Sequence, residues 1–187
     1  MKVIKTALLG VYILEPAVFG DTRGWFMESW SAEKMSKNGF DYNFVQDNHS
    51  FSAKKGVIRG IHFQNNPAAQ AKLVRCTNGS ILDIVVDIRK DSPTYKKWLS
   101  VELSAENKRQ LLIPRGFGHG FLTLTDDVEF MYKVDNLYNA AADRSIRWND
   151  PELAIEWGIT NPNVSEKDAN APLLRDSDCN FTWEVSQ

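Results

Sequence analysis

The sequence predicts an all-β protein, a sandwich or a barrel, on three observations. Strand-like segments rich in β-branched and aromatic residues recur along the chain, about ten of them, with turn residues between. Helical character is limited to two short stretches. Tyr, Lys, Arg, His and Asp recur inside the strands, which indicates one packed apolar face and another face that lines a polar cavity.

The composition is that of a globular protein and excludes several classes of function. A length of 187 residues without repeat or linker predicts one domain over residues 1–187. The 22 basic and 24 acidic residues leave a net charge of −2, which argues against a nucleic-acid partner. No apolar run is long enough to cross a membrane, so no membrane partner is expected either.

The cysteines and the N-terminus indicate a cytoplasmic protein. Cys76 and Cys179 make neither a disulfide framework nor a zinc site, and two free thiols fit a reducing compartment. The apolar run 7–14 ends at Glu15-Pro16 without a small-residue cleavage site. It is therefore interpreted as a first strand and not as a signal peptide.

The first fifty residues are expected to alternate between strands and turns around one helix. That helix covers residues 31–38, with Ser31 as N-cap and Gly39 as C-cap. In the strand that follows, period two places Gln46, Asn48 and Ser50 on one face, opposite Asp47 and His49. The other expected elements are a strand over 11–14, a turn over 20–24 and an aromatic strand over 25–30.

The stretch from Gly56 to Gln64 is the most informative strand. It is apolar and β-branched, yet it carries Arg59 and His62, which are costly to bury without partners. Strict alternation would send these two side chains to opposite faces. Gly60 lies between them, where a bulge could turn one side chain to the other face.

The rest of the chain continues the β pattern. A glycine-rich turn over 114–121 surrounds His119, and Ser165 to Asp168 resembles a capping box that opens a short helix. In the strand over 81–88, Asp83 and Asp87 lie opposite an apolar face. The remaining strands are expected over residues 72–76, 98–103, 110–113, 122–124 and 128–134, the last two joined as a hairpin.

The residues present favour acid–base chemistry over metal or nucleophilic chemistry. A metal site in such a barrel needs closely spaced histidines, but His62 is followed by Gln64 and no Glu completes a site. There is no Gly-x-Ser-x-Gly elbow, phosphate loop or dinucleotide fingerprint. Histidines, carboxylates, tyrosines and a strand lysine remain, and these can move protons.

Six motifs in order carry a resemblance to a known family. They closely resemble the dTDP-4-dehydrorhamnose 3,5-epimerases, called RmlC, from about residue 3 to about residue 175. The motifs are Val45-Gln-Asp-Asn-His-Ser50, Ile58-Arg-Gly-Ile-His-Phe-Gln64, Lys72-Leu-Val-Arg-Cys76, Ser104-Ala-Glu-Asn-Lys-Arg-Gln110, Gly116-Phe-Gly-His-Gly-Phe121 and Lys167-Asp-Ala-Asn-Ala-Pro172.

The resemblance implies a cupin-type jelly roll, a homodimer, and no metal or other cofactor. It implies epimerisation at C3 and C5 of dTDP-4-dehydro-6-deoxy-D-glucose, which gives dTDP-4-dehydro-L-rhamnose. A mono-epimerase that inverts only C3 or only C5 of a related sugar is the nearest alternative. A sugar-nucleotide-binding cupin without catalysis and a metal-dependent cupin are two further alternatives.

By the same resemblance, His62 is the base and Asp168 is the carboxylate that orients it. Lys72 stabilises the enolate and also contacts the substrate, and Tyr132 is the acid on the opposite face. His119, held by Asp83, binds the sugar.

The resemblance also assigns the nucleotide contacts. Arg23 and Arg59 hold the diphosphate, with Arg23 reaching the neighbouring subunit's site, and Tyr138 stacks on the thymine. Further contacts are Glu28, Gln46, Asp47, Asn48, Asp143 and Lys167. The chain departs from the family pattern beside His119, where Ala is expected at Gly118 and Glu at Arg115.

Overall fold

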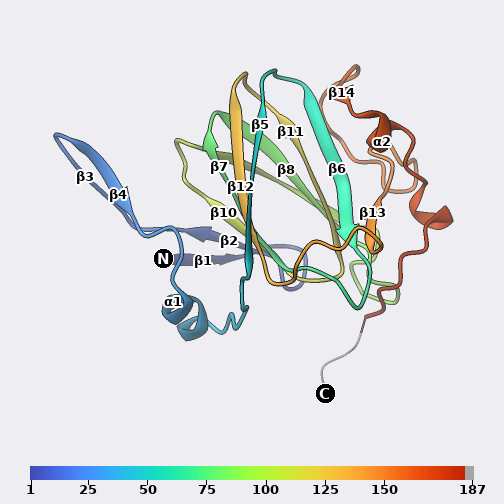
Figure 1. The fold of residues 1–187 in the computed structure, drawn as a ribbon, viewed down its shortest axis with the longest axis horizontal. Coiled ribbons are helices and arrows are strands. Elements are labelled where there is room, and N and C mark those ends of the chain that lie inside the picture. Colours follow the sequence, from blue (N-terminus) through green and yellow to red (C-terminus); the bar gives the residue numbers. More distant parts are fainter. Residues whose placement is uncertain (184–187) are drawn as a thin grey trace.

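The computed structural model describes residues 1–183, so residues 184–187 of the predicted domain lie outside it. Two antiparallel sheets face each other as a jelly roll (Figure 1). The first sheet has the order β1 (Lys2–Lys5), β2 (Tyr12–Glu15), β10 (Gln110–Ile113), β7 (Lys72–Asn78), β12 (Val128–Val134) and β5 (Gln46–Ser52). The second has the order β13 (Asp143–Ser145), β6 (Val57–Gln64), β11 (Phe117–Thr123), β8 (Ser80–Asp87) and β9 (Trp98–Ser104). The all-β prediction is therefore confirmed.

Smaller elements surround the two sheets. β3 (Val18–Asp21) and β4 (Gly24–Met27) form a hairpin that projects from the body at the left of Figure 1. The helix α1 (Ala32–Lys37) begins after the predicted N-cap, since the Ser31 side chain accepts a hydrogen bond from the Lys34 N–H. At the other end β14 (Asn163–Val164) runs parallel to β6, followed by α2 (Glu166–Ala169) and a 3₁₀ turn (Leu174–Asp176).

The apolar side chains form three clusters, and one of them lies between the sheets. Burial of these side chains is the main favourable term that holds the sheets together. On the outer side of the second sheet a further cluster is covered by residues 146–181, and on the outer side of the first sheet a small one is covered by α1. The cluster between the sheets includes Val74, Ile81, Val85, Leu111, Phe121 and Phe130.

Two local predictions are wrong. Residues 122–134 do not form a hairpin, because β11 pairs with β6 and β8 in the second sheet while β12 pairs with β5 and β7 in the first. The connection between β11 and β12 crosses from one sheet to the other. Likewise, the glycine-rich stretch around His119 is not a turn but the fully buried strand β11.

The glycines of β11 have a packing reason that sequence pattern alone does not show. A Cβ at Gly120 would lie 2.8 Å from the carbonyl oxygen of Arg59, and a Cβ at Gly118 would lie 2.4 Å from Cγ2 of Ile61. The strand needs glycine here because β6 approaches it too closely for a side chain. Among residues 1–183, no helix is long and apolar enough to span a membrane.

Candidate active site

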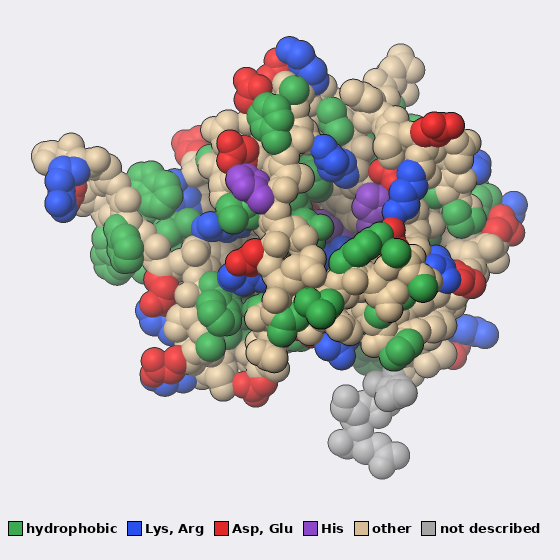
Figure 2. Space-filling view, viewed as in Figure 1, with side chains coloured by type: hydrophobic (Ala, Val, Ile, Leu, Met, Phe, Trp, Pro, Cys, Tyr) green, Lys and Arg blue, Asp and Glu red, His purple; other side chains and the backbone are tan. Residues whose placement is uncertain are grey.

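A cavity opens between β5 and β6, where the two sheets part at the front of the molecule. Figure 2 shows a hollow in this region with histidine and basic side chains at its edge. Three strands of each sheet contribute polar groups to it, so the interior between the sheets is polar on this side. Its lining residues are Ser50, Arg59, His62, Phe63, Gln64, Gln70, Lys72, His119, Phe121, Phe130, Tyr132, Tyr138 and Asp143.

A bulge in β6 brings Arg59 and His62 to the same cavity. His62 pairs with His119 and Arg59 pairs with Phe121, so three steps along β6 match two steps along β11. The extra residue reverses the alternation, and both side chains line the cavity. Gly60 lies at this bulge with φ +129°, where a Cβ would be 2.5 Å from the Cα of Gly120. The predicted bulge is therefore confirmed.

His62 is held by a buried carboxylate. Its Nε2 lies 2.6 Å from Oδ1 of Asp168, and the Gly60 N–H donates to Oδ2 of the same carboxylate at 3.3 Å. Burial alone would raise the pKa of Asp168, but the hydrogen bonds from His62 and the Gly60 N–H and the charge of His62 outweigh it and lower that pKa. Asp168 is therefore an ionised acceptor that fixes the ring and leaves Nδ1 for a substrate proton.

A second histidine–carboxylate pair lies deeper in the cavity. The ring Nε2 of His119 is 2.9 Å from Oδ2 of Asp83, and both side chains are buried. Burial raises the pKa of Asp83 and lowers the pKa of His119, although each partner's charge works against these shifts. The predicted contact between His119 and Asp83 is confirmed, and it holds the imidazole beside the stacked ring of Phe130.

Lys72 and Tyr132 lie on the first sheet. The Lys72 Nζ is 5.9 Å from the centroid of the Tyr132 ring. Burial lowers the pKa of Lys72 to about 8, while Asp83 and Asp143 work in the opposite direction. Lys72 is therefore still mostly protonated at pH 7 and loses its charge as the pH rises through about 8.

Tyr132 has the properties of a proton donor. Burial and the charge of Asp143 raise the pKa of its phenol, and only Arg59 works to lower it. The phenol is therefore neutral at neutral pH and keeps a proton to give. Arg59 is the cation that would favour the phenolate formed once that proton has left.

His62 and Tyr132 line the cavity from opposite sheets. His62 projects from β6 in the second sheet, and Tyr132 projects from β12 in the first sheet. A flat carbanion held between them would have a proton acceptor on one side and a proton donor on the other. This geometry allows a proton to be removed from one face of a carbon and returned to the opposite face.

Polar residues of β5 and the loop after β12 form one side of the opening. Tyr132 pairs with Asn48, so Asn48 shares the inner face of the sheet, as period two predicts. Gln46 donates from Nε2 to Asn48 Oδ1 at 2.9 Å and accepts at Oε1 from the Tyr138 N–H at 3.1 Å. The Tyr138 side chain is 60% exposed, so its ring is free to stack on a base.

Charged residues form the other side of the opening. The Lys167 Nζ donates to Oδ2 of Asp143 at 2.6 Å and thereby joins α2 to β13. Arg59 donates to the Ser52 hydroxyl and the Phe51 carbonyl and pairs with no carboxylate in the described chain. A second hollow shares Arg59 and His62 with the cavity and also contacts Lys54, Asn163, Ser165, Lys167 and Asp168.

Gln46 and Asn48 do not line the cavity themselves and are connected to it through the Tyr138 N–H. Three further predicted binding residues lie away from the cavity within one chain. Asp47 points outward from β5 and pairs with Lys133 at 2.9 Å, because it alternates with Gln46 and Asn48. Glu28 lies at the base of the projecting hairpin and pairs with Lys34 at 2.9 Å. Arg23 lies in the hairpin itself, beside Asp21.

Several cavity residues were not predicted. Ser50 and Phe121 could have been found by period two from Asn48 and His119. Gln64 donates to the carbonyls of Ala68 and Leu137 and accepts from the Asn139 N–H, so it orders the loop that carries Tyr138. The remaining missed residues, Phe63, Gln70 and Phe130, have no signal in the local pattern.

Metal ligands are not gathered at this site. Among residues 1–183, no group of three or more His, Cys, Asp or Glu side chains is arranged to hold a metal ion. The amide of Gln64, which stands where a metal barrel would place a second histidine, is used by backbone partners. The expectation of a metal-free reaction stays a prediction.

The two departures from the family pattern have different consequences. Gly118 contacts Ile61 so closely that an alanine would require Ile61 to move. Arg115 pairs with Asp135 at 3.0 Å, and the other oxygen of Asp135 accepts the N–H of Ala71. Arg115 therefore acts through the segment next to Lys72 and not through His119.

The sequence resembles known epimerases over most of its length. Residues 5–176 match the family model described as dTDP-4-dehydrorhamnose 3,5-epimerase. The protein of that name from Shigella flexneri is 53% identical over 179 residues, which cover 95% of this chain and 98% of the relative. The one from Salmonella typhimurium is 55% identical over 176 residues, which cover 93% and 96%.

Solved structures give the same result. The Bacillus anthracis dTDP-4-dehydrorhamnose 3,5-epimerase with TDP and PPi bound has a TM-score of 0.90 at 52% identity, covering 92% of this chain and 98% of that one. The Legionella pneumophila RmlC in complex with dTDP-4-keto-L-rhamnose has a TM-score of 0.94 at 41% identity, covering 98% and 99%.

The fold and this cavity, together with these relatives, define a cupin-type jelly-roll isomerase. The chain belongs to the dTDP-4-dehydrorhamnose 3,5-epimerase family.

Proposed function

We propose that this protein converts dTDP-4-dehydro-6-deoxy-D-glucose to dTDP-4-dehydro-L-rhamnose by inverting C3 and C5, a step of dTDP-L-rhamnose biosynthesis. The observation that carries this proposal is the position of His62 and Tyr132 on opposite sheets of one cavity. The names of the family and its relatives, and the ligand in the Legionella pneumophila structure, support the same substrate class.

The reaction follows from the chemistry of a proton beside a ketone. His62, oriented by Asp168, removes the proton from C3 or C5, and the charge moves to the C4 oxygen. The Lys72 ammonium stabilises that enolate, an effect of ~3–4 kcal/mol for a preorganised donor. Tyr132 then returns a proton from the opposite side, which inverts the carbon.

The other groups hold the substrate while these protons move. His119, fixed by Asp83, binds the sugar, and Arg59 holds the diphosphate with its forked donors. Lys167 and Asp143 close the same side of the opening as Arg59. Gln46, Asn48 and Tyr138 contact the nucleotide, with the exposed Tyr138 ring stacked on thymine.

Deuterium labelling tests the function directly. After extended EDTA treatment and dialysis, the protein is incubated with the 4-keto substrate in D₂O and the product is analysed by NMR. We expect deuterium at both C3 and C5 and the L-configured product, because protons and not a metal carry the reaction. Inversion at one carbon alone would instead identify the protein as a mono-epimerase. A structural neighbour with 34% sequence identity, ChmJ, is named a 3'-monoepimerase. Loss of activity that added Zn²⁺, Fe²⁺ or Mn²⁺ restores would refute the metal-free mechanism.

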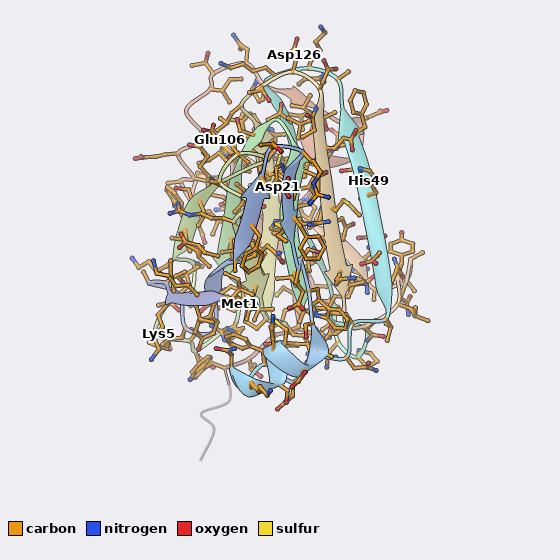
Figure 3. The ribbon with its side chains drawn as sticks, turned by 90° about the vertical axis from the view of Figure 1, so that its left-hand side faces the viewer. Met1, Lys5, Asp21, His49, Glu106 and Asp126 are labelled. Atoms are coloured by element: carbon orange, nitrogen blue, oxygen red, sulfur yellow. The ribbon has the colours of Figure 1, made fainter. Side chains whose placement is uncertain are left out.

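We further propose that the protein acts as a homodimer in which the β3–β4 hairpin completes the partner's site. The hairpin exposes Phe19, Trp25 and Phe26 at 67%, 58% and 70% of their surface, which is unusual for side chains of this size. Figure 3 views the hairpin end-on, with Asp21 at its tip in front of the strands. Arg23 lies beside Asp21 and is placed to reach a diphosphate on a neighbouring subunit.

Complementation between two variants tests the shared site. Arg23→Ala should raise KM about tenfold or more, because a charge-assisted contact to the diphosphate is lost. When Arg23→Ala and His62→Asn chains are co-expressed, each mixed dimer has one site with both residues intact. At substrate concentrations below KM, activity should return to about one quarter of the wild-type value, since half the dimers are mixed and each has one complete site. No recovery would place Arg23 in the site of its own chain or in no site.

A further inference from the structure

The carboxylate that orients the base is not carried by either sheet. Asp168 belongs to a strap, residues 163–172, which lies across β6. At one end Val164 pairs with Ile58, and the Asn163 N–H donates to the Gly56 carbonyl at 2.8 Å. At the other end Arg147 donates to the carbonyls of Ala171 and Pro172 at 3.0 and 2.9 Å. The position of Asp168 therefore depends on the conformation of the strap between these two anchors.

The middle of the strap has little packing of its own. α2 is a single turn of four residues, and Asp168 is its only buried residue. An isolated turn is unstable without capping or tertiary contacts. The turn is ordered at its start by the Ser165 hydroxyl, which accepts the Asp168 N–H at 3.1 Å. Ser165 is exposed to solvent, so it contributes no apolar packing to the fold.

The capping box is used in an unusual way. In a reciprocal box, the acidic residue three positions after the serine would turn back toward the serine N–H. Here the Asp168 carboxylate points instead to His62 and to the Gly60 N–H, at 2.6 and 3.3 Å. Ser165 thus fixes the backbone of Asp168 while leaving its carboxylate free for the base.

We propose that Ser165 is a positioning residue for the proton transfer: its hydroxyl holds the backbone of Asp168 so that the carboxylate meets His62. The effect of Ser165 on catalysis rests on the proposed function, whereas its effect on the contact between Asp168 and His62 does not. The Gly60 N–H supports the same carboxylate from β6, but only proline would remove this N–H, and the φ of +129° at Gly60 excludes proline. The charged groups that share the hollow with Asp168 are Lys54, Arg59, His62 and Lys167.

Three variants of Ser165 separate the effect of its hydroxyl on the position of Asp168 from its effect on the stability of the helical turn. Ser165→Ala removes the cap, whereas Ser165→Thr retains a capping hydroxyl. Ser165→Gly lacks the hydroxyl but remains a good N-cap residue, so it keeps the turn. Ser104→Ala is the matched control, because the Ser104 hydroxyl accepts the Asn107 N–H at 3.0 Å with the same spacing, at the end of β9, an edge strand of the second sheet.

We expect Ser165→Ala and Ser165→Gly to lower kcat about tenfold with KM changed less than about twofold, as for lost support of a catalytic group. Ser165→Thr should retain most of the wild-type kcat, and Ser104→Ala should retain all of it. The acid limb of the pH profile should move to higher pH in the Ala and Gly variants, because the Asp168 carboxylate is then held less firmly against His62 and the Gly60 N–H, whose hydrogen bonds lower its pKa. If Ser165→Gly matches the wild type in kcat and pH profile, or if only KM rises, the proposal is overturned.

A spectroscopic measurement separates this proposal from the proposed function. In wild-type protein, the Nε2–H of His62, assigned by its absence in His62→Asn, should give a downfield proton resonance that exchanges slowly. In folded Ser165→Gly or Ser165→Ala protein it should move upfield and exchange faster, whether or not the protein turns over the proposed substrate. An unchanged resonance overturns the positioning role, whereas a changed one in a protein without epimerase activity refutes only the function.

Discussion

Replacing His62 with asparagine is expected to abolish deuterium incorporation at both C3 and C5 of the 4-keto substrate. The loss should be at least ~10²-fold, the typical effect of removing a general base. We expect His62 to act at both carbons, since its imidazole lines the cavity with Nε2 held by Asp168 at 2.6 Å and Nδ1 left for the substrate. NMR of the recovered sugar measures exchange at each carbon separately.

Asparagine is chosen because it can still hydrogen-bond to Asp168, which would otherwise be left as a buried carboxylate without its partner. His49→Asn is the matched control. His49 also pairs with a carboxylate, Glu129 at 3.1 Å, but it lies on the outer face of β5 (Figure 3), so its loss should not change the rate. Exchange that persists at one carbon in His62→Asn would show that another group, with His119 the first candidate, is the base there.

The features of the site that depend on local periodicity could be predicted from the sequence. Period two placed Gln46 and Asn48 on the inner face of β5, and the same alternation shows why Asp47 lies outside. Gly60 between Arg59 and His62 indicated a bulge, and the register with β11 contains one. These inferences need only the neighbours of a residue along its own strand.

The features that depend on pairing between distant strands could not be predicted in this way. The stretch around His119 contains three glycines and was interpreted as a turn, yet β6 and β8 enclose it as a strand. The apolar runs on either side of Thr125–Asp127 look like a hairpin, because alternation does not say which sheet a strand joins. The contact between His62 and Asp168 spans 106 residues, and only the family resemblance indicated it.

Tyr132→Phe separates inversion from enolisation. Epimerisation requires a proton to leave one face of the carbon and another to arrive at the opposite face. If His62 performed both steps, the original configuration would return and only exchange would be seen. Tyr132 faces His62 from the other sheet, and burial raises the pKa of its phenol, so it holds a proton at neutral pH.

The substitution removes only the hydroxyl. The ring packs against Phe130, with centroids 5.7 Å apart, and phenylalanine keeps that contact. We expect a folded variant that still exchanges the protons at C3 and C5 for deuterium through His62 and Lys72, yet forms little or no doubly inverted product. Tyr42→Phe is the control, because Tyr42 is also a half-buried phenol whose pKa is raised by burial, but it packs on the outer side of the first sheet.

Two results would contradict the assignment of Tyr132 as the acid. One is formation of the L-configured product by Tyr132→Phe at close to the wild-type rate, since another donor would then protonate the opposite face. The other is complete loss of exchange in a variant that folds and binds dTDP normally by calorimetry. In that case the hydroxyl would be required for enolisation, and Lys72, whose pKa of about 8 leaves it charged at neutral pH, would not suffice to stabilise the enolate.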